Sequence, residues 1–277
     1  MNSRAVSLLL SLFLLLSGAA LAQKYEPQVG QAGKDVIWVP TPDDVVERML
    51  TMAQVTPKDT VFDLGAGDGK IAIMAAKKFG ARAYGIEYNP DMAKHANANA
   101  QAQGVAGNGQ GKALIRQGDI FASDFSSATV VTMYLLPGLN MKLRPTLLSM
   151  RPGTRVVSHS FTMEDWEADE ISSVDGRRAY FWVVPAQVQG TWSLDAGARP
   201  QDLVFEQTFQ KIAGTVAFGP VAGGLRDPRL RGSQISFSFV DQAGVRRDLA
   251  GVVTGSKMEG SWRDEKGGSG RWSATKK

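Results

Sequence analysis

Apolar positions in the first two thirds of the chain alternate between short runs and longer stretches with helical spacing. The short runs predict strands at residues 60–64, 82–88, 113–117, 129–135 and 154–161. The longer stretches predict helices at residues 42–53, 69–79, 90–103 and 139–150. Strand–helix alternation of this kind predicts a parallel sheet covered by helices on both faces.

Local sequence signals predict a hairpin at the sheet edge and the start of the first helix. Strands at residues 170–174 and 178–184 are joined by Asp175 and Gly176, a pair typical of tight hairpin turns, so we expect an antiparallel hairpin at one sheet edge. Before the first helix, Thr41 is expected to be the N-cap, with Pro42 at the first helical position.

After Ala186 the pattern changes to short strands separated by glycine and aspartate. Strands are predicted at residues 191–194, 203–210, 215–218, 234–240, 248–254, 258–263 and 271–274. Such a series predicts a small antiparallel β-barrel or sandwich. We therefore expect two domains, residues 23–186 and 187–277. Trp192, Trp262 and Trp272 follow a Gly-x-Trp pattern and either fill the core, which we favour, or form an aromatic platform for a ligand.

The N-terminal residues have the pattern of a cleavable signal peptide. Arg4 precedes an apolar run over residues 5–16, and residues 20–22, Ala-Leu-Ala, have the small-x-small form of a cleavage site. A membrane-spanning helix needs about 20 apolar residues, which is more than this run provides. We expect removal of residues 1–22, a mature chain that starts at Gln23, and a periplasmic or secreted product with no integral membrane span.

Composition narrows the chemistry of the chain. The sequence contains no cysteine, which excludes disulfides, thiolate metal sites and cysteine nucleophiles. Its two histidines, His95 and His159, leave little room for a histidine metal cluster or a catalytic triad, so no metal is expected. A net charge of only +4, with Lys and Arg scattered, gives no support to a nucleic-acid partner.

Residues 61–70 carry the strongest chemical signal. An apolar strand ends in Asp63, and a turn with Gly65, Gly67 and Gly69 at alternate positions opens a helix. Because glycine has no Cβ, such a turn folds tightly and lets its backbone approach a ligand closely. Open α/β folds bind their ligands at this carboxyl edge of the sheet. We therefore predict a binding site there that includes Gly65 and Gly67.

Two ligands that contain adenosine, NAD and SAM, are candidates for this turn. The dinucleotide fingerprint has the spacing G-x-G-x-x-G, whereas this turn reads G-x-G-x-G directly after Asp63. The Asp63 carboxylate would repel the pyrophosphate of NAD, but it would attract the ammonium and sulfonium groups of S-adenosylmethionine (SAM). Electrostatics therefore favours SAM as the cofactor.

Two further strand ends complete the predicted cofactor site. Glu87 ends the second strand, near the roughly 20-residue spacing that ribose-binding acids have after the glycine turn, and can accept hydrogen bonds from both ribose hydroxyls. Asp119 ends the third strand and can accept from the adenine amine, while Ile120 and Phe121 flank the ring.

Three motifs, at residues 63–70 (DLGAGDGK), 85–90 (GIEYNP) and 118–121 (GDIF), resemble those of class I methyltransferases. Residues 38–42 (WVPTP) and 156–161 (VVSHSF), the latter followed by Asp165 and Trp166, narrow the resemblance to the family of mitochondrial protein-lysine methyltransferases and their bacterial relatives, some of them exported.

The resemblance spans about residues 37–185 and does not cover the C-terminal β region. It implies a Rossmann-like sheet, SAM as the cofactor, and the assignments already made for Asp63, Gly65, Gly67, Glu87 and Asp119. Thr41, within residues 38–42, is assigned to the same site.

The acceptor side of the site is less defined. In related methyltransferases the segment after the fourth strand lines the acceptor pocket, and here it comprises residues 134–140. The Asn/Asp-Pro-Pro-aromatic tetrad of many N-methyltransferases is absent, which argues against DNA or glutamine methylation. Tyr134 either orients an acceptor amine, as a catalytic residue, or packs at the strand end. His159 is either a base or, as we favour, a hydrogen-bonding residue at a strand end.

These signals predict methyl transfer from SAM to an amine or oxygen acceptor, in a protein lysine or a small molecule. Because SAM is a cytosolic metabolite and export is expected, two alternatives stay open. The chain is an exported module that binds SAM or a nucleoside without turnover, or it is an enzyme held at a membrane by a retained signal.

Overall fold

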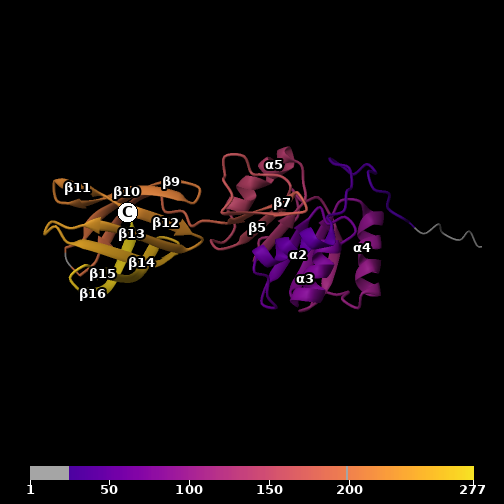
Figure 1. The fold of residues 1–277 in the computed structure, drawn as a ribbon, viewed down its shortest axis with the longest axis horizontal. Coiled ribbons are helices and arrows are strands. Elements are labelled where there is room, and N and C mark those ends of the chain that lie inside the picture. Colours follow the sequence, from indigo (N-terminus) through magenta and orange to yellow (C-terminus); the bar gives the residue numbers. More distant parts are fainter. Residues whose placement is uncertain (1–24, 198) are drawn as a thin grey trace, which may run out of the picture.

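The computed structural model describes residues 25–197 and 199–277. They form two sheets, which occupy the two parts of the molecule seen side by side in Figure 1. The expected signal peptide and its cleavage site lie outside the described residues. Within the described part, no helix is long and apolar enough to cross a membrane.

The first sheet has seven strands in the order β3-β2-β1-β4-β5-β7-β6. The first five are parallel to one another, whereas β7 runs antiparallel to β5 and to β6. The expected parallel sheet with an antiparallel hairpin at one edge is confirmed. The strands are β1 (Thr60–Leu64), β2 (Arg82–Glu87), β3 (Ala113–Gln117), β4 (Val130–Met133), β5 (Arg155–His159), β6 (Glu170–Val174) and β7 (Arg177–Val183).

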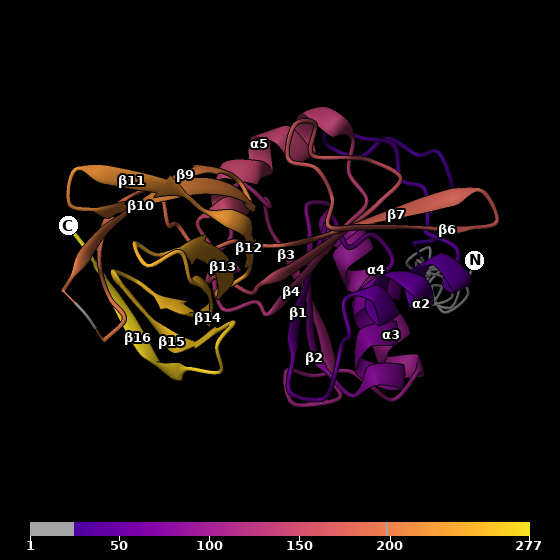
Figure 2. The same ribbon diagram turned by 60° about the vertical axis from the view of Figure 1, so that its left-hand side comes forward.

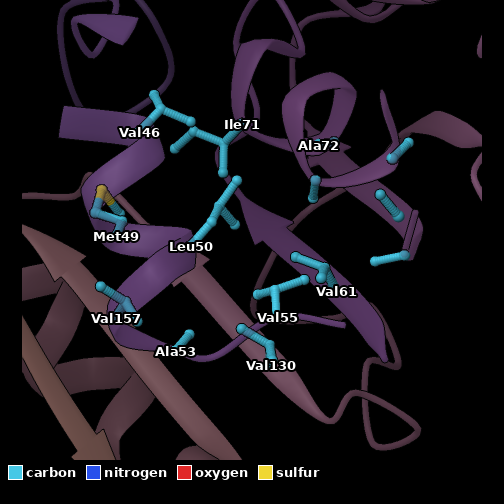
Figure 3. Close-up of a cluster of buried hydrophobic side chains, with 14 of the residues drawn as sticks. Val46, Met49, Leu50, Ala53, Val55, Val61, Ile71, Ala72, Val130 and Val157 are labelled. Carbon is cyan, nitrogen blue, oxygen red and sulfur yellow. The ribbon is translucent and has the colours of Figure 1, made fainter. Parts of the chain in front are cut away.

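Helices cover both faces of this sheet because its strands are apolar on both sides. Val61 of β1 packs in one core cluster with residues of α2 and α3, whereas its neighbour Phe62 packs in a second cluster with Leu143 of α5. Figure 3 shows the first cluster, where Leu50 of α2 and Ile71 of α3 meet the strands. The helices are α2 (Asp43–Met52), α3 (Lys70–Phe79), α4 (Pro90–Ala102) and α5 (Pro137–Leu148).

The start of α2 differs from the expectation. Pro42 is the N-cap residue and no side chain caps the helix, so the assignment of Thr41 as the N-cap is wrong. Thr41 is buried, and its Oγ1 lies 3.1 Å from Nδ1 of His159 at the end of β5. The hydroxyl therefore contacts a distant strand instead of the helix that follows it in sequence.

The hairpin of β6 and β7 follows its local sequence. Asp175 and Gly176 have φ values of 47° and 78°, both in the left-handed region. Two consecutive residues with positive φ are what a type I′ turn requires, and Asp-Gly is among the pairs that adopt it most readily.

The second sheet has nine antiparallel strands in the order β11-β10-β9-β8-β16-β15-β14-β13-β12. It curls into a nearly closed barrel (Figure 2), and the backbone N–H of Leu225, just after β11, extends the β10–β11 pairing by donating to the carbonyl oxygen of Gly214 in β10 at 2.9 Å. The strands are β8 (Gly190–Asp195), β9 (Gln201–Thr208), β10 (Lys211–Phe218), β11 (Val221–Gly224), β12 (Arg226–Arg231), β13 (Gln234–Val240), β14 (Arg246–Thr254), β15 (Lys257–Asp264) and β16 (Ser269–Lys276).

The sequence pattern missed the two edge strands of the barrel. β11 is short and largely exposed, and β12 contains Pro228 and a register shift between Arg226 and Arg229. Edge strands have one unpaired side, so they tolerate proline, charge and irregular pairing, and they lack the apolar alternation of central strands.

Two of the three Gly-x-Trp tryptophans fill the barrel core. Trp192 and Trp272 are buried, and their Nε1 atoms donate to the carbonyl oxygens of Val188 and Ala250 at 2.7 and 3.1 Å. This supports the core-filling interpretation for both. Trp262 is only partly buried and lies under the guanidinium of Arg247, 4.8 Å from its ring centroid.

Candidate functional site

A cavity of about 350 Å³ opens at the carboxyl ends of the parallel strands. This volume falls within the roughly 300–1,000 Å³ typical of small-molecule sites. The cofactor and catalytic candidates expected from the sequence line this one cavity: Thr41, Asp63, Gly65, Gly67, Glu87, Asp119, Ile120 and Tyr134. Phe121, expected to flank the adenine with Ile120, does not line it. The structure thus brings these candidates together, while their individual roles in binding and catalysis stay predictions.

The glycine turn forms the floor of the cavity. Gly65, Gly67 and Gly69 all have positive φ values, of 78°, 52° and 81°. At Gly67 there is also no room for a side chain, because a Cβ would lie 2.5 Å from Nε1 of Trp38. Trp38 therefore packs directly over the turn and lines the same cavity.

Asp63 is a buried carboxyl group at the end of β1. Its Oδ1 accepts a hydrogen bond of 2.8 Å from Oγ1 of Thr132 on the adjacent strand β4. Burial, together with the nearby charges of Asp68 and Glu87, raises the pKa of Asp63 to about 7. The group therefore titrates near neutral pH, and it has no cationic partner among the described residues.

Glu87 holds the glycine turn in place from the end of β2. Its Oε2 accepts from the backbone N–H of Gly67 and its Oε1 accepts from that of Asn89, both at 2.9 Å. Each carboxylate oxygen has two lone pairs, so both can accept a further hydrogen bond from a ligand. The two N–H donors fix the orientation of the carboxylate before any ligand arrives.

Asp119 has a partner that the sequence did not indicate. Its Oδ2 lies 2.7 Å from Nζ of Lys34, and its Oδ1 accepts from the backbone N–H of Phe121 at 2.9 Å. The hydrogen bond from Lys34 lowers the pKa of Asp119. Lys34 belongs to the segment of residues 31–41, which forms one wall of the cavity.

Aromatic rings form the end of the cavity beyond β4. Tyr134 follows β4, and its ring stacks on that of Phe161, with centroids 6.0 Å apart. The ring of His159 lies 4.0 Å from that of Tyr134 on another side. We call the wall made by Tyr134, Leu136 and Phe161 the acceptor side. Phe161 belongs to the family motif at residues 156–161 but was not among the expected site residues.

His159 supports this wall instead of lining the cavity. Burial, and to a smaller extent the charge of Arg177, lowers its pKa to about 4, so the imidazole is neutral at pH 7. Its Nδ1 contacts Thr41, and its buried Nε2 has no hydrogen-bond partner among the described residues. This geometry agrees with the strand-end interpretation and leaves little basicity for proton abstraction.

The chemistry of the lining residues fits SAM. The glycine turn leaves no room for a Cβ, so a ligand can lie close to its backbone. The buried Asp63 has no counter-ion, and Glu87 is held at the next strand end. Together these features suit a cationic nucleoside. Within residues 25–197 and 199–277, no cluster of three histidine, aspartate or glutamate side chains could hold a metal ion.

Comparison with known proteins points to methyltransferases. The ANTKMT methyltransferase domain family matches residues 63–170. A protein-lysine N-methyltransferase of Saccharolobus islandicus is 46% identical over 142 residues, which cover 50% of this chain and 86% of that protein. The adenine nucleotide translocase lysine N-methyltransferase of Mus musculus is 31% identical over 124 residues, which cover 44% of this chain and only 52% of that protein.

A solved structure agrees with these sequences. The RNA methyltransferase from Salinibacter ruber, in complex with S-adenosyl-L-homocysteine, is 49% identical and superposes with a TM-score of 0.52. The match covers 54% of this chain and 96% of that one. The names of the similar proteins thus agree on methyl transfer but give different acceptors.

Proposed function

The chain belongs to the class I family of SAM-dependent methyltransferases, and from this membership we propose that it methylates the ε-amine of a lysine in a protein. SAM is its cofactor and methyl transfer its activity. The lysine acceptor is supported by the names of the archaeal and mouse relatives.

Different lining residues would contact different parts of the cofactor. Asp63 would attract the amino-acid ammonium, Glu87 would accept from the ribose hydroxyls, and Asp119 and Ile120 would contact the adenine. When bound, SAM supplies a methyl group attached to a positively charged sulfur, and the sulfur is displaced in line when a nucleophile attacks the methyl carbon. The contribution of the chain is to position the two reactants and to exclude water.

The aromatic acceptor side is the observation that carries the lysine proposal. Tyr134 and Phe161 stack on each other and line the cavity together with Trp38, so the methylene stem of a lysine entering there would pack against apolar ring faces. Lysine must lose a proton before it can attack, and an apolar wall favours that loss by lowering the pKa of the amine. His159, whose lowered pKa of about 4 makes its neutral imidazole a weak base, is poorly suited to take the proton.

Transfer of label from SAM to defined acceptors tests the proposal. Residues 23–277 are incubated with methyl-labelled SAM and either poly-L-lysine or total RNA, and the products are hydrolysed and separated. We expect label in methyl-lysine with poly-L-lysine, and much less label with the Asp63→Asn variant at the same SAM concentration. Label only in RNA would overturn the lysine acceptor. SAM binding without transfer to either polymer would support the binding-module alternative.

We also propose that the chain is exported. The positive start at Arg4, the apolar run over residues 5–16 and the Ala-Leu-Ala at residues 20–22 support a cleavable signal. Mass spectrometry of periplasmic and secreted fractions is expected to detect a chain beginning at Gln23. A full-length product confined to the cytosol would contradict export.

A further inference from the structure

We propose that the β9–β10 turn of the barrel, Phe209 and Gln210, positions the acceptor side of the cavity. No described residue of the barrel lines the cavity, so this action is indirect. The turn contacts residues 160–169, which link β5 to β6 and carry Phe161 at their start. The part of the inference that concerns the acceptor rests on the proposed function.

The conformation of the turn is unusual for its sequence. Thr208 pairs with Lys211, so Phe209 and Gln210 form a two-residue hairpin turn. Phe209 has a φ of 54°, and Gln210 is not among the residues with positive φ. A turn with positive φ at its first position is normally made with glycine, so a phenylalanine there is strained. Within the hairpin, Nε2 of Gln207 donates to the carbonyl oxygen of Phe209 at 2.7 Å, and contacts outside the hairpin also hold the turn.

Those contacts come from the first part of the chain. The hairpin points from the barrel toward the first sheet (Figure 1). The ring of Phe209 stacks on that of the fully buried Trp166, with centroids 6.1 Å apart, and the guanidinium of Arg144 on α5 lies 5.3 Å from its centroid. Phe209 thus packs against the core of the methyltransferase sheet instead of the barrel core.

Both the oxygen and the nitrogen of the Gln210 side-chain amide form hydrogen bonds with the segment of residues 160–169. Its Oε1 accepts from Nε1 of Trp166 at 3.0 Å. Its Nε2 donates to the carbonyl oxygen of Glu167 at 2.8 Å and to Oδ1 of Asp169 at 3.2 Å. One side chain of the barrel therefore contacts three residues within residues 160–169.

The other end of that segment forms the acceptor side. Nδ2 of Asn140, buried on α5, donates to the carbonyl oxygens of Phe161 and Thr162 at 3.4 and 3.1 Å. Met163 and Trp166 form a β-bridge in the middle of the segment, and both are fully buried. A continuous set of buried and hydrogen-bonded residues therefore connects Trp166 with Phe161.

Two substitutions in the mature full-length chain test the inference. Gln210→Ala leaves the buried Nε1 of Trp166 without its acceptor. Phe209→Gly removes the stacked ring while relieving the positive-φ strain of the turn. The matched control is Gln242→Ala, which removes a hydrogen bond of 3.0 Å to the carbonyl oxygen of Phe218 within the barrel.

Hydrogen exchange, SAM affinity and transfer kinetics are measured on each variant. We expect amides of residues 160–169 to exchange about tenfold faster in both hairpin variants, because each variant loses one buried hydrogen bond or one stacked ring. In the control, these amides should exchange at the parent rate. The SAM dissociation constant should stay within about twofold, because residues 63–120 hold the cofactor. KM for poly-L-lysine should rise about tenfold, while β13 to β15 exchange as in the parent.

Unchanged exchange over residues 160–169 in both hairpin variants would overturn the inference. So would faster exchange with KM and kcat both unaltered. If the parent transfers no methyl group to poly-L-lysine, the lysine proposal fails separately, and the exchange of residues 160–163 around Phe161 then decides the inference alone.

Discussion

Oδ1 of Asp63 accepts a hydrogen bond from Oγ1 of Thr132, at 2.8 Å, where β1 and β4 run side by side. The two residues are register partners and both are buried. The hydroxyl orients the carboxyl group without neutralising it, so a group with a pKa of about 7 stands at the cavity floor.

SAM affinity should depend on pH through Asp63. Burial raises its pKa to about 7, so the fraction ionised rises between pH 6 and pH 8. Because the cofactor is cationic, it should bind the ionised form, and affinity should fall by up to about tenfold per pH unit below pH 7. Calorimetry at pH 6, 7 and 8 measures this. Equal affinities at all three values would mean that Asp63 does not face the cationic groups.

Asp63→Asn should raise the free energy of unfolding and weaken SAM binding. The amide oxygen can still accept from Thr132, while the burial of a charge is removed, so the free energy of unfolding of the SAM-free protein at pH 8 should rise by about 1–2 kcal/mol. SAM binding should weaken by about 1.5–3 kcal/mol. Thermal unfolding at pH 8 and pH 5 provides the check, because the gain should be smaller at pH 5, where Asp63 of the parent is protonated when folded but still ionised when unfolded.

Glu87→Ala should weaken SAM binding by about 1.5–3 kcal/mol, the scale of charged hydrogen bonds. The carboxylate also accepts from the N–H of Gly67 and Asn89, so part of the loss reflects a looser turn. Calorimetry measures the effect. Glu170→Ala is the control, since Glu170 is half-exposed and pairs with Arg48 outside the cavity. Parent-like affinity in Glu87→Ala would show that the ribose assignment is wrong.

His159 should make the fold sensitive to acid. Its folded-state pKa is about 4, below the ordinary value of 6.5, so the unfolded chain binds the extra proton first. Stability is therefore complete above pH 6.5 and falls toward pH 4, by at most about 1.4 kcal/mol per pH unit. Urea unfolding of the parent and of His159→Gln between pH 4 and pH 7 compares the slopes. If the free energy of unfolding depends on pH in the same way in both proteins, a group other than His159 takes up the proton.

A fragment of residues 23–186 should fold and bind SAM with near-parent affinity, because every lining residue lies within it. Residues 187–277 should fold alone around the core that contains Trp192 and Trp272. The fragment loses the Gln210 acceptor for Trp166, so residues 160–169 should be less protected. Calorimetry and gel filtration of both fragments test the division. A folded, monomeric fragment that fails to bind SAM would contradict it.

Much of the fold and of the candidate site follows from local sequence. Alternation of apolar runs placed the strands and helices of the first sheet, and Asp175-Gly176 placed its hairpin, because each signal acts within a few residues. Asp63, Glu87 and Asp119 could be grouped before any coordinates, since carboxyl ends of parallel strands meet at one edge.

Contacts between distant segments were decided only by the tertiary structure. Thr41 was expected to cap a helix but faces His159, 118 residues away, and Lys34 reaches Asp119 across 85 residues. No local pattern encodes either pair, because each depends on how the segment of residues 31–41 crosses the sheet. The barrel edges also escaped the pattern, since β11 and β12 pair on one side only and need no apolar alternation.

The sequence by itself therefore determined the class of the fold, the glycine turn and the acids at the strand ends, because backbone preferences and strand periodicity act locally. The tertiary structure decided which of these residues are already paired, which are buried without a cationic partner, and that Gln210 of the barrel contacts Trp166 beside the acceptor side. Burial and pairing are properties of the packed chain, and they set the pKa of Asp63 and the strain at Phe209.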